Sequence, residues 1–328
     1  MLRKSFILLT VTAAALSLTS GCKDKTTTPP PTADTTTVDV PSFNADSAYA
    51  HIVTQCDFGP RVPDSEAHSH CGNYIVAAFE RLGLTVTEQR TQVQRWDGQT
   101  VGCRNLIAAF APEALDRIMV CAHWDSRPWA DHDPDSTKWR TPVPAANDGA
   151  SGVAVMLEVA RQLVARQPAI GVDFVCFDAG TPEWANAEDS EDSWCLGSQY
   201  WAKNPHYRDV LPRYAILLDM VGGPDARFCY EGYSLRYAQT VVDKVWSAAE
   251  RAGYGEFFPR QDGGYITDDH VPLNETGIPA IDIIPYYANT ATGFCPTWHT
   301  VSDTPEHIDK NALQAAGQTL LQVIYEEK

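Results

Sequence analysis

The sequence predicts a single α/β domain built on a central mixed, mostly parallel sheet that is flanked by helices. Short apolar runs with the length of strands alternate with longer segments whose apolar residues recur at helical spacing. Such alternation is typical of a sheet that is covered by helices on both faces. With 328 residues, of which 44% are hydrophobic, the chain can bury the core of one large domain.

The expected elements follow one another in a regular order. The first helix covers 44–56, with Asn44 or Asp46 as its cap, and the second covers 65–83 and ends at Gly83. The predicted strands are 85–93, 104–110, 116–125, 172–178, 214–222 and 279–284. The remaining predicted helices are 149–166, a short one around 197–203, 235–252 and 311–327.

The first 22 residues are typical of an export signal rather than of a folded domain. Arg3 and Lys4 precede an apolar run that is short for a membrane span, and small residues lead to Cys22. This arrangement resembles a bacterial lipoprotein signal, which predicts a lipidated Cys22 and a periplasmic or cell-surface position on the cell envelope. An ordinary signal peptide is the alternative. The Thr- and Pro-rich segment 23–40 is expected to be a tether to a domain at 41–328.

Charge and cysteine content limit the partners and the chemistry. A net charge of −17 repels phosphate backbones and argues against nucleic acid as a partner. The eight cysteines after Cys22 show no paired C-x-x-C metal pattern. Cys121 and Cys176 lie in apolar runs and are expected to be buried thiols, whereas Cys56 and Cys71 could form a disulfide if the chain is exported.

Acids and imidazoles follow the ends of the predicted strands. In chain order they are His123, Asp125, Asp148, Asp219, Asp268, Asp269, His270 and His299, the last of which follows Trp298. In open sheets, ligands bind beyond the carboxyl ends of the strands, so these side chains are expected to converge. Mixed Asp and His ligation suits a catalytic Zn²⁺. Taken alone, each acid would more often be a cap or a surface residue, and Asp148 would be a fair helix cap.

Four segments together resemble the zinc-dependent aminopeptidase superfamily, and within it the glutaminyl cyclases with their bacterial lipoprotein members. They are AHWDS, AANDGASGVAVMLEVAR, LLDMVG and ITDDHVPLNETGIPAIDII, and the resemblance extends from about Ala45 to the C-terminus. Two details favour the cyclases. Aminopeptidases usually carry Ser-Asp-His where this chain has Asp268-Asp269-His270, and cyclases place a Trp before the last zinc ligand, as Trp298 precedes His299 here.

The resemblance implies a role for each matched residue. Asp148 and His299 would bind one zinc ion, and Asp219 and Asp268 would be hydrogen-bonded acids in the pocket. Trp194 and Trp298 would form the wall that holds an N-terminal glutamine, although core packing is an equally good interpretation of Trp194. His123 would lie behind the metal in a cyclase, and it would bind a second zinc ion in an aminopeptidase.

The implied function is zinc-dependent cyclisation of the N-terminal glutamine of peptides or proteins to pyroglutamate, with release of ammonia. Two alternatives stay open. One is a zinc aminopeptidase, and the other is a non-catalytic binding domain at the cell surface.

The segment FDAGTPEW departs from the family pattern. The family places a catalytic acid and the third zinc ligand two and three positions after the strand-end Asp178, where this chain has Gly180 and Thr181. Bacterial relatives often read D-A-E-D-x-G, as though three residues were missing here.

Three interpretations of this gap stay open. In the first interpretation, Glu183 or a following acid replaces the missing acids as catalytic group and ligand. In the second, the fold persists with weak zinc binding, and in the third, the sequence is an altered form of an active enzyme. Segment 180–192 is expected to be a surface loop.

Overall fold

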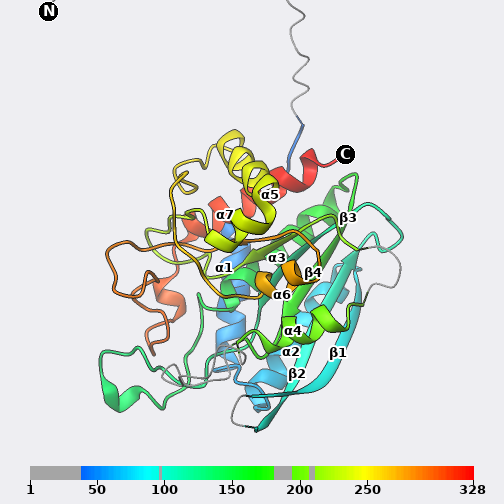
Figure 1. The fold of residues 1–328 in the computed structure, drawn as a ribbon. Coiled ribbons are helices and arrows are strands. Elements are labelled where there is room, and N and C mark those ends of the chain that lie inside the picture. Colours follow the sequence, from blue (N-terminus) through cyan, green and yellow to red (C-terminus); the bar gives the residue numbers. More distant parts are fainter. Residues whose placement is uncertain (1–37, 96–97, 181–193, 207–210) are drawn as a thin grey trace, which may run out of the picture. The chain divides into compact units, whose positions relative to one another are not determined.

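Among the described residues, six strands form one sheet in the order β1-β2-β4-β3-β5-β6 (Figure 1). The computed structural model describes residues 38–95, 98–180, 194–206 and 211–328, and residues 38–328 form one compact unit. The strands are β1 (Thr85–Gln94), β2 (Thr100–Phe110), β3 (Arg117–His123), β4 (Gly171–Phe177), β5 (Ala215–Leu218) and β6 (Ala280–Ile283). The helices are α1 (Ala45–Asp57), α2 (Glu66–Arg81), α3 (Ala150–Ala165), α4 (Leu196–Lys203), α5 (Gly232–Arg251), α6 (His270–Glu275) and α7 (Lys310–Glu326).

The sheet is mixed, as predicted. β1 pairs antiparallel with β2, and β2 pairs antiparallel with β4. The four strands β4, β3, β5 and β6 are parallel to one another. Their carboxyl ends therefore meet at one edge of the sheet, which is where ligands bind in folds of this kind.

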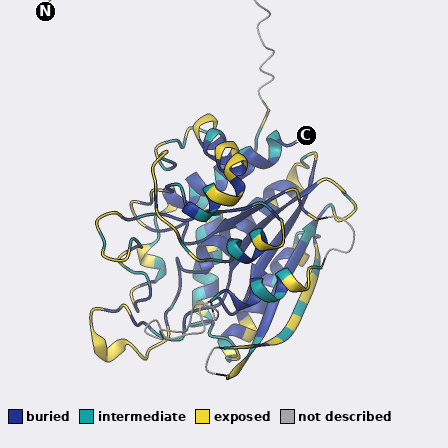
Figure 2. Ribbon diagram, viewed as in Figure 1, coloured by how far each residue is buried: buried dark blue, intermediate teal, exposed yellow. Residues whose placement is uncertain are grey.

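Alternation along the strands sends apolar side chains to both faces. Val120 and Phe174 belong to a large core shared with α1, α2, α3, α5 and α7. Cys121 and Val175, one position further along, pack on the opposite face against Trp201 of α4 and residues next to α6. Helices on both faces bury β3, β4, β5 and β6 completely, as Figure 2 shows for the centre of the sheet, whereas the edge strand β1 stays largely exposed.

The observed helices differ from the predicted ones at a few points. The side chain of Asn44 caps α1 as expected, whereas α5 begins at Gly232 because the side chain of Glu231 accepts hydrogen bonds from two of its first backbone amides. The six-residue α6 was not predicted from the sequence. A helix of about one and a half turns that contains Pro272 is too short to show a helical period. Within the described part of the chain, no helix is both long and apolar enough to cross a bilayer.

The expected buried thiols are confirmed, but the suggested disulfide is not formed. Cys121 and Cys176 are buried. Cys56 and Cys71 are both free thiols. The Sγ atom of Cys56 faces the carbonyl oxygen of Pro144 at 3.9 Å, while Cys71 packs in the main core.

Candidate active site

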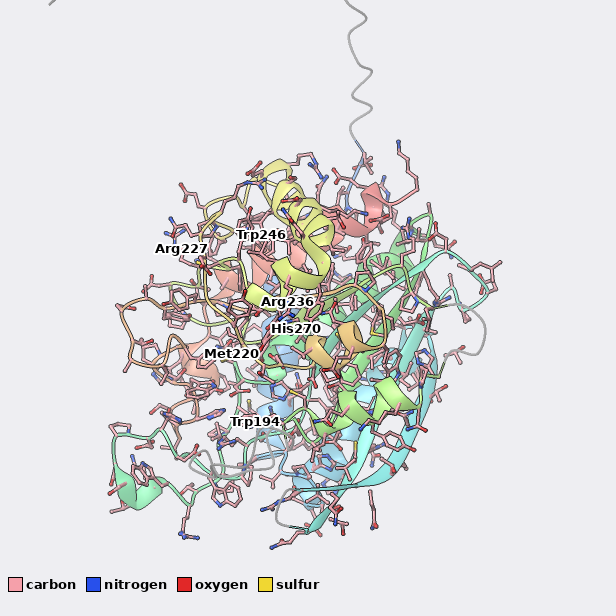
Figure 3. The ribbon with its side chains drawn as sticks, in the orientation of Figure 1. Trp194, Met220, Arg227, Arg236, Trp246 and His270 are labelled. Carbon is pink, nitrogen blue, oxygen red and sulfur yellow. The ribbon has the colours of Figure 1, made fainter. Side chains whose placement is uncertain are left out.

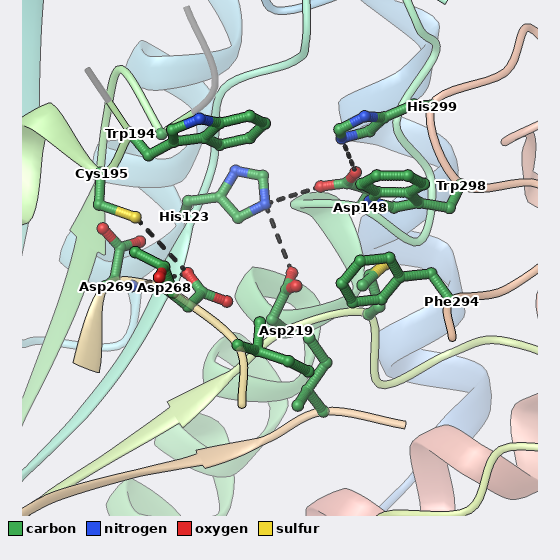
Figure 4. A pocket seen from close by; sticks show the side chains of 15 residues that line it. His123, Asp148, Trp194, Cys195, Asp219, Asp268, Asp269, Phe294, Trp298 and His299 are labelled. Carbon is green, nitrogen blue, oxygen red and sulfur yellow. Dashed lines mark hydrogen bonds and ion pairs between the residues drawn. The ribbon is translucent and has the colours of Figure 1, made fainter. Parts of the chain in front are cut away.

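The strand-end side chains gather around a cavity of about 70 Å³ at the carboxyl edge of the sheet (Figure 4). Asp219 and Met220 follow β5, while Trp194 and Cys195 precede α4. Figure 3 labels Met220 and Trp194, which reach this region from distant parts of the chain.

Asp125 and His270 were expected to converge with the other strand-end side chains but do not line the cavity, because Asp125 contacts His123 and the amide of Gly180, and His270 contacts Glu231. All the described residues to which the family resemblance assigns catalysis, substrate binding or zinc ligation do line it. These residues are Asp148, Asp219, Asp268, Trp194, Trp298 and His299.

Asp148 lies between two imidazoles. Its Oδ1 is 2.9 Å from Nε2 of His123, and its Oδ2 is 3.3 Å from Nε2 of His299. The helix that follows is capped instead by Gly149, whose φ of 114° favours glycine, and no side chain caps it. The interpretation of Asp148 as a helix cap is therefore wrong, and its carboxylate is free to face the cavity.

His299 is held between ionic and aromatic neighbours. Its Nδ1 lies 3.7 Å from Oδ1 of Asp131. The carboxylate of Asp131 also accepts two hydrogen bonds from the buried guanidinium of Arg127, one at each oxygen. The Arg127 guanidinium lies over the ring of Trp194 at 5.1 Å. That ring is almost parallel to the imidazole of His299, and Trp298 stacks on the same imidazole at 3.7 Å. One cluster thus orients a candidate ligand together with both predicted wall residues.

Three carboxyl groups face the cavity opposite Trp298 and Phe294 (Figure 4). Burial raises the pKa of Asp268 well above its usual range, and the nearby Asp219 and Asp269 raise it further. Burial likewise raises the pKa of Asp219, and it raises the pKa of Asp269 to about 6. Like charges confined together disfavour ionisation, so the pKa values of these three acids are raised together.

The two histidines have opposite protonation preferences. Burial lowers the pKa of His299 to about 4 despite the nearby Asp148, so its imidazole is neutral at pH 7. Burial opposes the charge of His123 as well, but hydrogen bonds to Asp125, Asp148 and Asp219 raise its pKa well above the usual value. His123 contacts Asp148 and Asp219 directly, and contact with a candidate ligand is what a residue that lies behind the metal would make.

The end of β4 carries no carboxylate into the cavity among the described residues. The side chain of Asp178 is buried away from it, where it accepts hydrogen bonds from the backbone amides of Arg104 and Ala179 and contacts His68. Gly180 lines the cavity and donates its amide to Asp125. Glu183, and most of the predicted loop 180–192, lie outside the described residues.

The donors present fit a divalent metal ion such as zinc. Ligand atoms of His123, Asp148 and Asp219 all lie within 4.8 Å of one another. Two ligands bound tetrahedrally at about 2 Å are roughly 3.3 Å apart, which matches the contacts of Asp148 and Asp219 with the imidazoles. The Oδ1 atom of Asp219 is buried without a hydrogen-bond partner, and a bound cation would compensate it.

Some residues that build the site gave no signal in the sequence. The carboxylate of Asp303 accepts hydrogen bonds from the backbone amides of Asn147 and Asp148, and so holds the segment that carries the candidate ligand. Burial and the charge of Asp148 raise the pKa of Asp303 to about 7. The pair of Arg127 and Asp131 was also missed. Ion pairs between residues four positions apart are common on exposed helices. The spacing of this pair therefore did not indicate that both side chains are buried.

Known proteins with similar sequences and structures share this architecture. The sequence model of the protein family described as "Peptidase family M28" matches residues 105–324 of this chain. The aminopeptidase YwaD of Bacillus subtilis is 30% identical over 267 residues, which cover 77% of this chain but only about half (51%) of that protein. The glutaminyl cyclase of Bacteroides thetaiotaomicron, solved with N-acetylhistamine, has 49% identity and a TM-score of 0.85 over 88% of this chain and 100% of its own. A Zn-dependent exopeptidase from Parabacteroides distasonis has 49% identity and a TM-score of 0.86 over the same shares.

The matched region contains β3 to β6 and most of the side chains that surround the cavity, and the likeness to the solved cyclase extends over almost the whole compact unit. The chain therefore belongs to peptidase family M28, and within that family it resembles the bacterial glutaminyl cyclases.

Proposed function

We propose that this protein is a glutaminyl-peptide cyclotransferase, which converts the N-terminal glutamine of peptides or proteins to pyroglutamate. The observation that carries the proposal is the convergence of Asp148, His299 and a group of acids with raised pKa values, together with Trp298, on one small cavity. The identity of 49% with a protein named glutaminyl cyclase supports it.

The reaction is an intramolecular aminolysis. The α-amino nitrogen of the glutamine bonds to the carbon of its own side-chain amide, and the bond from that carbon to the amide nitrogen breaks. One proton moves from the attacking amine to the leaving nitrogen, which departs as ammonia. The substrate supplies its own nucleophile, so the site has to orient the side chain, exclude water and carry that proton.

The described residues can perform these tasks. The rings of Trp194 and Trp298 would hold the flat amide side chain and exclude water. Burial and the neighbouring Asp219 raise the pKa of Asp268 well above its usual range, which favours the protonated carboxyl that would donate to the leaving nitrogen. Asp219, whose pKa is also raised by burial, can exchange protons with Asp268 in the same cavity.

Zinc is the cofactor that we propose for this site, one ion per chain. Asp148 and the neutral imidazole of His299 would bind it, and among the described residues His123 and Asp219 lie close enough to complete the set. Bound zinc would polarise the side-chain amide of the substrate as a Lewis acid. Thr181 stands where the family pattern has the third zinc ligand, and Glu183 remains the proposed substitute.

The test of the proposed function compares this chain with a version that restores the family pattern. Glu-Asp and one further residue are inserted between Ala179 and Gly180, and conversion of a Gln-initiated peptide to its pyroglutamyl form is measured by mass spectrometry. We expect the restored version to be faster by about a hundredfold or more, because a positioned acid or base contributes about that much.

The other outcomes are equally informative. High and equal rates would mean that an acid of the natural chain, with Glu183 the first candidate, already does the work. The variant Glu183→Gln would then lose activity. No conversion by either version would contradict the cyclase and favour a binding domain at the cell surface.

Aminopeptidase activity is the second candidate. The direct contact of His123 with Asp148 and Asp219 favours it, since this arrangement could hold a second metal ion. Release of leucine from a Leu-initiated peptide, with no conversion of the Gln-initiated peptide, would decide for the peptidase.

We also propose that Cys22 is lipidated and anchors the protein to the bacterial cell envelope. The support is the sequence pattern of a positive start, a short apolar run and small residues before the cysteine. Membrane fractionation of cells that express the full chain should find it with the membrane, and Cys22→Ala should release it. Retention of the Cys22→Ala variant would contradict the anchor, whereas loss of export without release would indicate an ordinary signal peptide.

A further inference from the structure

A cysteine and two acids form a second cluster of metal-ligating side chains beside the candidate active site (Figure 4). One ligand atom from each of Cys195, Asp268 and Asp269 lies within 4.8 Å of the other two. The cluster shares no residue with the ligands proposed for the active-site zinc. We call these three residues the thiol site.

The separation of the thiol from the first acid fits a bound divalent cation. Zinc lies about 2.3 Å from a thiolate sulfur and about 2.0 Å from a carboxylate oxygen, so a tetrahedral ion holds the two ligand atoms about 3.5 Å apart. The Sγ atom of Cys195 is 3.9 Å from Oδ1 of Asp268, which leaves only a small adjustment to be made. A hydrogen bond from the thiol is the other interpretation of this contact.

Asp269 supplies the observation that favours a cation. The residue is 1% exposed, and its Oδ1 accepts a hydrogen bond from the hydroxyl of Ser198 at 2.5 Å. Its Oδ2 is buried and has no hydrogen-bond partner among the described residues. A buried carboxylate oxygen without a partner is costly, and a cation would remove that cost. A hydrogen bond between the thiol of Cys195 and Asp268 would leave the cost in place.

The backbone holds the thiol in position before any ion binds. Cys195 has a φ of 59°, in the left-handed region that residues with a side chain adopt only when their surroundings impose it. Its amide donates to the carbonyl oxygen of Gly180, and its own carbonyl oxygen accepts a hydrogen bond from the hydroxyl of Ser198. The same hydroxyl donates to Asp269. Ser198 thus links two of the three residues of the thiol site.

A hollow of about 460 Å³ beside α4 and α6 gives the thiol site an approach of its own. Cys195 and Asp268 line both this hollow and the small cavity, so an ion can reach them without passing the proposed zinc position. Lys203 and Glu275 also line the hollow, and their charges offset each other. The net charge of −17 attracts cations to the chain as a whole.

We propose that the thiol site binds a second divalent cation with affinity for thiolate, such as Zn²⁺ in excess of the active-site ion, and that this ion inhibits the enzyme. The ligand groups bind in their deprotonated forms, so the Cys195 thiol and any protonated carboxyl release their protons to solvent. The ion then occupies the carboxylate of Asp268, the group proposed to protonate the leaving nitrogen. The inhibition rests on the proposed cyclase function, whereas binding of the ion does not.

The thiol site fills only when metal is in excess. Burial and the neighbouring acids raise the pKa of Cys195 well above its ordinary value, so the thiol carries a proton at pH 7. An ion has to displace that proton, which weakens its binding. The enzyme is therefore active with one equivalent of zinc and inhibited by further equivalents.

The test follows Co²⁺ binding by absorption, because a cobalt–thiolate bond gives a charge-transfer band that oxygen and nitrogen ligands do not give. The protein is the full chain with Cys22→Ala, whose eight remaining cysteines are all free thiols of the described domain, stripped of metal beforehand with a chelator. Co²⁺ should produce the band, and Cys195→Ser should abolish it. Cys56→Ser is the matched control and should keep it, because that thiol faces the carbonyl oxygen of Pro144 instead of acids.

Asp269→Asn tests the site without any change of the thiol. The amide oxygen of asparagine can still accept the hydrogen bond from Ser198, so the variant keeps this contact. It should raise the Co²⁺ concentration that produces the band by at least about tenfold, since losing even an outer partner of a metal site costs that much.

Conversion of a Gln-initiated peptide is measured in parallel at one and at several equivalents of Zn²⁺. The rate should fall by about a hundredfold or more in excess zinc, because the ion removes a general acid. Cys195→Ser should lose this inhibition, judged by the ratio of its own two rates.

The outcomes separate this inference from the proposed function. Absence of the band, its survival in Cys195→Ser or its equal loss in Cys56→Ser would overturn the thiol site. A band without inhibition would overturn the regulatory role. A band in a chain that converts no peptide at any zinc concentration would support the thiol site and contradict the cyclase.

Discussion

The candidate ligand His299 depends on a neighbouring acid for its orientation. Oδ1 of Asp131 lies 3.7 Å from Nδ1 of His299, and that nitrogen has no hydrogen-bond partner among the described residues. A metal-bound imidazole places its proton on the other nitrogen, where a carboxylate stabilises it. Asp131 is therefore positioned to keep Nε2, the nitrogen that faces Asp148, available for the metal.

At the residue scale, Asp131→Asn should weaken zinc binding by about tenfold or more, because it removes this charge while it keeps the size of the side chain. Competition with a chromophoric chelator measures the affinity, and circular dichroism checks the fold. Asp133→Asn is the control, since Asp133 binds the backbone amide of Val301 in the same region without facing His299. Similar losses in both variants would mean that only the loop was disturbed.

At the scale of elements, the start of α5 and the start of α6 are joined by one buried acid. The carboxylate of Glu231 accepts hydrogen bonds from the backbone amides of Tyr233 and Ser234, and it contacts Nε2 of His270 at 2.9 Å. Burial alone would raise the pKa of Glu231, but the hydrogen bonds from His270 and Ser234 together lower it to about 2. This acid holds α6, which directly follows Asp268 and Asp269, against α5.

A carboxyl group whose pKa is lowered by folding stabilises the protein above its unfolded pKa, and this contribution is lost as the pH falls through the folded value. For Glu231 the loss extends from about pH 4.5 down to about pH 2. Glu231→Gln should cost about 3 kcal/mol at pH 7, because the pKa falls from 4.5 to about 2 and each pKa unit corresponds to about 1.4 kcal/mol. Urea unfolding of both proteins at pH 7 and pH 3 tests this prediction. A cost that is the same at both pH values would contradict it.

At the scale of the whole molecule, the acids and imidazoles of the site are a source of instability without a cation. Asp148, Asp219 and Asp268 are drawn together from different elements by the folding of the entire sheet. A ligand that binds only the folded chain stabilises it, by about 2.7 kcal/mol at a hundredfold excess over Kd. Zinc should therefore raise the Tm of the protein, and a chelator should reverse the increase.

Differential scanning calorimetry at several zinc concentrations measures this effect. Asp148→Asn is the matched variant, because it keeps the shape of the central residue but weakens its contact with the cation. Its Tm should rise much less with zinc. A Tm that does not depend on zinc in the natural chain would mean that the missing acids after Ala179 cannot be replaced and that the site does not hold the metal.

The sequence by itself determined the order and type of most elements. Apolar periodicity is a local property, so α3, β4 and β6 could be predicted almost to their ends, whereas the predicted strand 214–222 extends four residues beyond β5. The sequence also placed Asp148, Asp219, Asp268 and His299 at one edge of the sheet. It could do so because the carboxyl ends of parallel strands meet at that edge. Whether Cys56 and Cys71 pair stayed open for the complementary reason: the distance between them depends on packing rather than on their spacing in the chain, and both are free thiols.

Only the tertiary structure decided which of these side chains touch. Asp148 contacts both imidazoles because the strand order brings β3, the start of α3 and the loop before α7 together, and Asp303 secures that segment from a position 155 residues away in the chain. A larger cavity that adjoins the site is also lined by residues from distant parts of the chain, such as Trp194 and Phe294. Contacts at such separations depend on the path of the whole chain, and no local pattern encodes them.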